Sequence, residues 1–496
     1  MQEELKKYHT QSYILIAFIV FMLITRIRLI FSYSIDLDGV EFMFIHYIQN
    51  ILFHKGMYSD IYKYPFDTVI HMPLYTYIMA GILKLFHLTT VNDIHAQLIV
   101  CRLLSVLCLP VTVFYMLKIL KQFNKDNFVS LCVICFFMLL LTGHFFSARQ
   151  DALKTTFYLM FLYYSLGYLN KIKSLRFFVF ASISLYLAIN MKQDIIVYVF
   201  LYLLTVLFIY RNGRSLLLIF VFFLCISVTY ILGFTFFNKK FLDNTILLNF
   251  QIGTTYLTSY NFVAMLFSIA RTSPVLLFLI YLHKKNIEIL KEKKDLYVLV
   301  YLSYVTYGIA HLLILRGSSY INYTHESIAV ILITIGSLLS YYTISEKFLK
   351  RMTITSSVLL LSSIIIHAYP LSGRHEIEYK KKYTQNLQNR KIINSIIKDS
   401  TVFFTTGDNT IFYPDKKIVY GYDYHIDQFI YAYLGFTTHT KLVFLKTDLY
   451  DSYIADGNIK FIIANDNERD KEIMNKNFGN YIFYKKVHNL LVYKYP

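Results

Sequence analysis

The sequence is poor in charged residues, proline and glycine, and it contains no tryptophan. Only 16% of its 496 residues are Asp, Glu, Lys or Arg, whereas soluble domains average about 25%. The 7 prolines and 17 glycines are few for a transporter built from interrupted helices. Beside 45 Tyr and 43 Phe, the missing tryptophan is typical of an AT-rich genome. These shortages exclude an ordinary soluble protein and disfavour a transporter.

Cysteine is also scarce, and its pattern indicates no disulfide framework or metal site. All five cysteines fall inside apolar runs. Cys132 and Cys135 form a Cys-x-x-Cys pair, a spacing found in zinc and redox sites. No second thiol pair or histidine pair lies near them, so we expect small core residues. No other cluster has metal-ligand spacing, and we predict no metal and no cofactor.

Long apolar runs dominate the first three quarters of the chain. A helix of about 20 residues crosses a bilayer core of about 30 Å. The sequence therefore predicts a polytopic α-helical membrane protein with about 11 spans, at 13–31, 96–117, 127–147, 152–170, 175–191, 194–210, 215–237, 261–283, 296–315, 325–343 and 352–370. The first run follows Lys6 and Lys7 and lacks a small-residue cleavage site, so we expect an uncleaved anchor.

The basic residues indicate the membrane topology of the chain. If the short run 73–88 does not cross the membrane, residues 34–95 form one outer loop and the later Lys/Arg clusters face the cytoplasm. If it crosses, those clusters flip outward, against the positive-inside rule. We therefore expect 73–88 to lie at the outer interface, with the N-terminus cytoplasmic. The net charge of +18 then reflects cytoplasmic loops, and no nucleic acid partner is predicted.

The composition changes after residue 370, which marks a predicted domain boundary. Residues 1–370 would form the transmembrane domain, and 371–496 an extracytoplasmic α/β domain. The segment 371–394 is polar and charged, and the strand-like runs that follow are 401–405, 460–464 and 481–493.

Polar side chains gather at the predicted outer helix ends, where membrane depth makes them expensive. Simpler interpretations exist for several of them. Asp36 and Asp38 could cap a helix, and Arg149 with Asp151 could be a structural pair. Lys192 with Asp194 could be an interfacial pair, and His71 an interfacial polar residue. Five separate loops carry such groups on one face, however, whereas the inner face has only Lys/Arg clusters.

Such a face has the parts needed to transfer a sugar from a lipid phosphate. A carboxylate can accept a proton from an attacking hydroxyl. Arg and Lys can hold a phosphate and stabilise the charge on it as it leaves. Apolar grooves beside them can hold a lipid tail.

The ordered motifs of this face resemble a known family, the GT-C glycosyltransferases of the protein-mannosyltransferase and aminoarabinose-transferase type. The first outer loop resembles the family's acidic pair, Tyr-x-Asp turn and proline-led helix start at 36–41 (DLDGVE), 56–60 (GMYSD) and 71–75 (HMPLY). Further matches follow in order at 102–105 (RLLS), 149–153 (RQDAL), 191–193 (MKQ) and 317–326. Two departures stand out: the acidic pair reads Asp38-Gly39 with Glu41 displaced, and a double proline reads Met72-Pro73. The resemblance spans roughly 13–370.

The resemblance implies an inverting glycosyltransferase that uses a polyprenyl-phosphate sugar, undecaprenyl phosphate in a bacterial host, and a glycan, lipid or protein acceptor. Asp38, or else Asp36, would be the general base. The implied donor-phosphate ligands are Arg102, Arg149, Lys192 and Arg316. The implied positioning residues are Glu41, Tyr58, His71, Asp151, Gln193, Asn322 and Glu326. A lipid-glycan transporter or flippase and a non-catalytic envelope assembly protein are the alternatives.

Overall fold

The computed structural model describes most of the chain, with gaps. The described residues are 9–35, 37, 41–60, 67, 69–140, 145–170, 174–247, 249, 259–315, 321–341, 351, 354, 358, 373–405, 407–419 and 456–496. They form two compact units that each combine separate stretches of chain. Unit 1 comprises 1–31, 102–231 and 256–372, and unit 2 comprises 32–101, 232–255 and 373–496.

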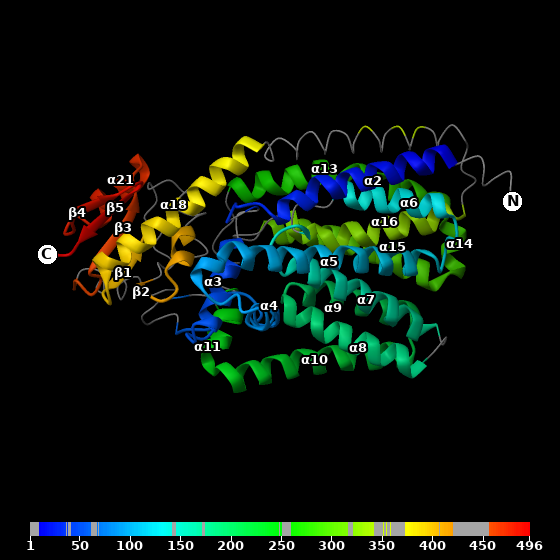
Figure 1. Ribbon diagram of the computed structural model, residues 1–496. Coiled ribbons are helices and arrows are strands. Elements are labelled where there is room, and N and C mark those ends of the chain that lie inside the picture. The colour runs from blue at the N-terminus through cyan, green and yellow to red at the C-terminus, as the bar shows by residue number, and fades with distance from the viewer. Residues whose placement is uncertain are drawn as a thin grey trace. The chain divides into compact units, whose positions relative to one another are not determined.

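Unit 1 is a helical bundle, and Figure 1 shows α2, α6, α15 and α16 running side by side in it. Its helices, of which α5 and α10 also extend into unit 2, are α2 (His9–Ile30), α5 (Ile94–Leu120), α6 (Asn127–Leu140), α7 (Asp151–Leu169), α8 (Ser174–Met191), α9 (Ile195–Tyr210), α10 (Gly213–Phe237), α13 (Ser259–Lys285), α14 (Ile287–Glu292), α15 (Lys294–Ile314), η4 (Ile321–Thr324) and α16 (His325–Leu339). Ten of the predicted spans correspond to these helices. Helix α6 is described as far as Leu140, and the α-helix does not continue to 147, because residues 145–150 form turns and bends.

Four described helical stretches are long and apolar enough to cross a membrane, at Val91–Leu120, Gly213–Phe237, Phe262–Lys285 and Lys294–Ile314. Large apolar side chains on them point outward, including Leu107, Phe220 and Phe267. Because water disfavours such surface, the chain is an integral membrane protein. The predicted count of about 11 spans stays a prediction, since 352–370 lies almost wholly outside the described residues.

Unit 2 begins with the first-loop helices α3 (Glu41–Leu52) and α4 (Leu74–Leu85), followed by the short η1 (Val91–Asp93). Helix α4 has 12 residues, about 18 Å of helix at 1.5 Å per residue, which is too short to cross a bilayer core. This agrees with the charge argument for 73–88. The short helices α11 (Lys239–Leu242) and η3 (Asp243–Leu247) also belong to unit 2.

The C-terminal part of unit 2 is a small α/β fold with a five-stranded sheet in the order β2-β1-β3-β5-β4. Its elements are α18 (Gly373–Ile397), β1 (Thr401–Phe404), η6 (Gly407–Phe412), β2 (Lys417–Val419), β3 (Phe461–Asn465), α21 (Glu468–Asn477), β4 (Ile482–Val487) and β5 (Leu490–Lys494). Strand β1 pairs in parallel with β2 and β3, whereas β5 is antiparallel to β3 and β4. The predicted α/β class is therefore observed.

One predicted strand run needs correction. The run 481–493 is a hairpin of two strands rather than one strand, because the chain reverses at His488 and Asn489. His488 adopts a φ of 49°, a left-handed conformation that a tight turn uses. The polar segment after 370 folds as the helix α18, which was not predicted.

Hydrogen bonds join the first loop to the C-terminal part within unit 2. The Glu376 carboxylate on α18 accepts from the Ser32 hydroxyl at 2.7 Å and from the Tyr33 backbone N–H at 2.6 Å. The Lys55 ammonium donates to the Lys416 carbonyl at 2.9 Å. Unit 2 is thus assembled from segments that are far apart in the sequence.

Gly336 is a position of close helix packing inside unit 1. A Cβ at Gly336 of α16 would lie 2.9 Å from both Leu120 and Val133, closer than side chains normally approach. We expect Gly336→Val to lower the free energy of unfolding by about 1–3 kcal/mol through overpacking, measured as the thermal midpoint in detergent. Gly308→Ala is the control, because nothing lies within 4 Å of its added Cβ. An equal midpoint for both variants would contradict this account of the packing.

Candidate active site

Six charged residues of unit 1 meet where three helix ends converge. We call Arg149, Asp151, Lys154, Lys192, Asp194 and Glu326 the charged cluster. They come from the start of α7 and the turn before it, from the link between α8 and α9, and from the first turn of α16.

Local helix geometry explains how the sequence places these groups. Asp151 and Lys154 are three residues apart on α7 and therefore share a helix face. Asp151 and Glu326 each lie in the first turn of a helix, where the positive end of the helix dipole favours a carboxylate. Asp194 directly precedes α9, at a third helix start.

The contacts within the charged cluster form a continuous chain of ion pairs. Asp151 lies 2.8 Å from the Lys192 ammonium and 3.1 Å from Nε of Arg149. Lys154 lies 2.9 Å from Asp194 and 3.3 Å from Glu326. Three cations and three carboxylates therefore share one site, with no excess formal charge among them.

Burial makes this pairing necessary. Lys154, Asp151 and Glu326 are fully buried, and no member is more than 8% exposed. An ion that leaves water without a partner loses several kcal/mol of solvation. The Thr155 hydroxyl adds a 2.6 Å hydrogen bond to Glu326. The charged cluster is therefore a desolvated, mutually neutralising network.

An aromatic ring lies beside the two lysines. The Lys192 ammonium is 4.7 Å from the ring centre of Tyr323, and that of Lys154 is 5.8 Å away, within range of a cation–π contact. The Tyr198 hydroxyl donates to the Tyr323 carbonyl at 2.6 Å. Tyr323 belongs to the motif at 317–326, so that motif and the motif at 191–193 meet here.

Four predicted site residues therefore lie together: Arg149, Asp151, Lys192 and Glu326. Gln193 lies between cluster members in the α8–α9 link. The interpretation of Lys192 and Asp194 as an interfacial pair fits poorly, because both are buried and each has a closer partner than the other. Arg316 and the side chain of Asn322 lie outside the part of the chain that is described.

Arg102, a predicted phosphate ligand, is fully buried on α5. Its guanidinium lies 3.4 Å from the carbonyl of Leu29 and 3.5 Å from that of Ile30. Those carbonyls end α2, and a cation at a helix C-terminus interacts favourably with the dipole. One turn further on α5, Ser105 donates to the Arg149 carbonyl at 3.2 Å, which fixes the chain just before α7.

Lys154 and Arg26 were not among the predicted site residues. The signal for Lys154 was its position three residues after Asp151, on the same helix face. Arg26 is a charge inside the apolar run of α2. It is 4% exposed, and within the described part of the chain its two terminal nitrogens have no hydrogen-bond partner. The guanidinium lies 5.5 Å from the Phe146 ring centre, and no described carboxylate contacts its buried charge.

The predicted first-loop residues lie in unit 2. Glu41 is buried at the start of α3 and accepts from the Leu37 backbone N–H at 2.8 Å. The Tyr58 hydroxyl donates to the His71 carbonyl at 2.7 Å, and the His71 ring stacks on Phe44. These contacts give Tyr58 and His71 a role in shaping the loop. The predicted bases Asp36 and Asp38 lie outside the described residues.

A buried polar group on α3 was not predicted. Nε2 of His46 lies 2.9 Å from Asp67, and Asn50 donates to the same carboxylate at 2.8 Å. Within the described ranges, no three His, Cys, Asp or Glu side chains are placed to hold a metal ion. Cys132 and Cys135 are both buried in the apolar core of unit 1.

Comparisons with solved structures identify the class of fold. No protein-family model matches the sequence, and no curated protein matches it. ArnT of Cupriavidus metallidurans bound to undecaprenyl phosphate superposes with a TM-score of 0.62 and 11% identity over 96% of this chain and 97% of that one. Its apo structure gives 0.57 over the same shares. An oligosaccharyltransferase of Archaeoglobus fulgidus, of which 73% is covered, gives 0.49.

At 11% identity, this likeness establishes the fold. The chain has the fold of ArnT across nearly its whole length. This agrees with the fold expected from the resemblance of its motifs to those of GT-C glycosyltransferases.

Removal of one charge from the charged cluster should destabilise the protein. We expect Lys154→Met to lower the free energy of unfolding by about 3–5 kcal/mol, because Asp194 and Glu326 would stay buried with their charge unbalanced. Thermal unfolding in detergent measures the effect. Lys291→Met is the matched control, since its pair with Glu288 is mostly exposed and contributes at most about 1 kcal/mol. Similar losses in both variants would show that the charged cluster is not a stabilising network.

Proposed function

We propose that this protein is an inverting glycosyltransferase that moves a sugar from a polyprenyl phosphate to an acceptor on the outer side of the membrane. The observation that carries the proposal is the fold likeness to ArnT over 96% of this chain, because that protein was solved with undecaprenyl phosphate bound. The ordered motifs and the charged cluster support it. The acceptor would be a glycan, lipid or protein of the cell envelope.

In the proposed reaction, an acceptor hydroxyl attacks the anomeric carbon of the donor sugar. Asp38, or else Asp36, takes the hydroxyl proton as general base. The new glycosidic bond forms as the bond to the phosphate oxygen breaks, and polyprenyl phosphate leaves with the electron pair. Attack opposite the leaving group inverts the anomeric centre. Arg102, Arg149, Lys192 and Arg316 are the proposed ligands of the phosphate.

The cations of the charged cluster are already paired with carboxylates, which affects how they could bind a phosphate. Asp151 holds both Lys192 and Arg149, so a phosphate that binds them competes with this carboxylate. Asp151 and Glu326 thereby become positioning residues, which keep the cations aligned in the absence of donor. We add Arg26 to the proposed phosphate ligands, because its guanidinium is buried and, among the residues that the structure describes, has no carboxylate in contact.

The proposed orientation follows the basic loops, with a cytoplasmic N-terminus and the domain at 371–496 on the outer side. We propose a mechanism that needs no metal ion, and dialysis against a chelator would then leave the transfer rate unchanged. A rate that falls on dialysis and returns with added divalent metal would overturn that part.

A transfer assay tests the mechanism. Membranes holding the protein are supplied with a labelled polyprenyl-phosphate sugar and an envelope extract as the acceptor source. We expect Asp36→Asn or Asp38→Asn to lower the rate by at least about 100-fold, because general-base catalysis contributes about 10²–10⁴. If both variants transfer the sugar at the wild-type rate, neither Asp36 nor Asp38 is the general base.

Arg26 gives a second test, in which stability and activity separate. We expect Arg26→Met to leave the thermal midpoint unchanged or higher, since a buried unpaired charge is removed. The donor KM should rise about tenfold or more, because a charge-assisted contact contributes about 1.5–3 kcal/mol. Arg28→Met, an exposed change in the same helix, should alter neither quantity. A lower midpoint with an unchanged KM would assign Arg26 a purely structural role.

The same preparations address the alternatives. A flippase would move a fluorescent polyprenyl-phosphate sugar across a vesicle bilayer without forming a glycoside. An assembly protein would complement a deletion strain even with Asp36 and Asp38 both changed to Asn.

A further inference from the structure

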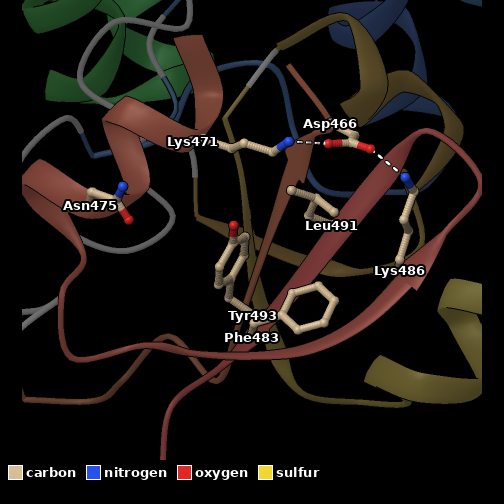
Figure 2. Close-up of a pocket in the computed structure, with 7 residues that line it drawn as sticks. All are labelled: Asp466, Lys471, Asn475, Phe483, Lys486, Leu491 and Tyr493. Atoms are coloured by element: carbon tan, nitrogen blue, oxygen red, sulfur yellow. Dashed lines mark hydrogen bonds and ion pairs between the residues drawn. The ribbon is translucent and has the colours of Figure 1, made fainter. Parts of the chain in front are cut away.

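The C-terminal part of unit 2 contains an open surface cavity of about 460 Å³ that the proposed reaction does not use. It opens beside α21, the edge strand β4 and the neighbouring strand β5. Figure 2 shows Asp466 between the ammonium groups of Lys471 and Lys486, with the rings of Phe483 and Tyr493 below them. A volume of this order is in the range of small-molecule binding sites.

A β-bulge builds one wall of this cavity. Phe483 and Lys486 are three residues apart, so in a regular strand they would point to opposite faces. The pairing register shifts between Phe483 and Lys485, and this extra residue brings Phe483 and Lys486 to one face. Their partners on β5 are Tyr493 and Leu491, which are two residues apart and also share that face. Bulges commonly re-aim a side chain in this way.

Helix α21 and the end of β3 supply the other wall. Lys471 and Asn475 are four residues apart on α21 and face the cavity, while Met474 packs into the core beneath. Asp466 follows directly after β3. The helix start is fixed because the side chain of Asn467 accepts from the Asp470 backbone N–H at 2.7 Å. The walls are therefore held by regular elements.

The charged groups of the cavity are aligned and accessible. Asp466 lies 2.6 Å from the Lys471 ammonium and 2.5 Å from that of Lys486. Hydrogen bonds from these lysines lower the pKa of Asp466 to about 2, so it stays ionised. Each lysine is about half exposed, at 50% and 56%, and an ammonium has three donors. Both lysines can therefore donate a hydrogen bond to an acceptor atom of a ligand.

The aromatic rings give the cavity a second chemistry. Phe483 is 54% exposed on the edge strand, where a large apolar side chain is unfavourable unless something covers it. Tyr493 meets it edge to face at 5.9 Å between ring centres. The electron-rich face of an aromatic ring suits the C–H groups of a sugar ring. The Asp466 carboxylate has free lone pairs that can accept from hydroxyls.

We propose that this cavity is a binding site for an anionic saccharide, a sugar that bears a carboxylate or phosphate group. Lys471 and Lys486 bind the anionic group, Asp466 and Asn475 bind hydroxyls, and Phe483 stacks on the ring. The inference rests on the proposed function only in one respect, that the bound saccharide is part of the acceptor. Binding itself needs no transfer activity.

The arrangement favours a saccharide over an acidic peptide. A site for a run of carboxylates would gain nothing from a carboxylate of its own at the centre, because like charges repel. A saccharide whose ring carries an anionic group beside its hydroxyls uses the lysines and Asp466 together.

Calorimetric titration of the full-length protein in lipid nanodiscs tests the site at low salt. The probes are trigalacturonic acid, neutral maltotriose and a triglutamate peptide. We expect trigalacturonic acid to bind at least about tenfold more tightly than either of the others, because it alone offers both sugar rings and carboxylates. Equal affinity for maltotriose, tighter binding of triglutamate, or no heat from trigalacturonic acid would overturn the proposal.

Single variants locate the binding in this cavity. Lys471→Ala should weaken the binding of trigalacturonic acid by about tenfold or more, because a charge-assisted hydrogen bond is lost. Phe483→Ala should weaken the binding by about three- to tenfold, because stacking on the sugar ring is lost. Lys485→Ala is the matched control, since it removes an exposed lysine of the same strand that pairs with Val492 on the other face. Gel filtration and thermal midpoints check folding. Unchanged affinity in Lys471→Ala and Phe483→Ala, or an equal loss in Lys485→Ala, overturns the assignment, whereas a failed transfer assay leaves it standing.

Discussion

The ammonium of Lys154, fully buried between Asp194 and Glu326, is the constraint around which unit 1 is organised. A charge in that position is tolerable only if the starts of α7, α9 and α16 stay together, because each supplies a partner. The same demand extends through Asp151 to Lys192 and Arg149. Helix packing and charge pairing therefore specify one arrangement jointly.

Much of the fold was predictable because membrane helices are recognisable from the length and apolar composition of their sequences. The residues at which the helices end were harder to predict. Residues 145–150, which follow α6, form turns and bends although Phe145 and Phe146 extend the apolar run, and composition cannot show where the backbone turns. The hairpin at 481–493 was hidden for a related reason, since one left-handed residue, His488, reverses a run that otherwise looks like a single strand.

The candidate site was predictable where charge interrupts the edge of an apolar run. Arg149, Asp151, Lys192 and Glu326 all do so, and they do meet. Lys154 and Arg26 lie within helices, where a lone charge is easily attributed to a surface position. Their burial is a property of the packed bundle, and the sequence alone does not contain it. The pairing of Asp151 with Lys192 likewise needs tertiary contacts between segments about 40 residues apart.

The discontinuity of unit 2 has a consequence for biogenesis. Residues 32–101 emerge from the ribosome long before 373–496, yet Ser32 and Tyr33 are held by Glu376, and Lys55 by Lys416. The contacts that hold the first loop therefore form only after residues 373–496 have been synthesised. Synthesis of the first loop and completion of unit 2 are separate events in time.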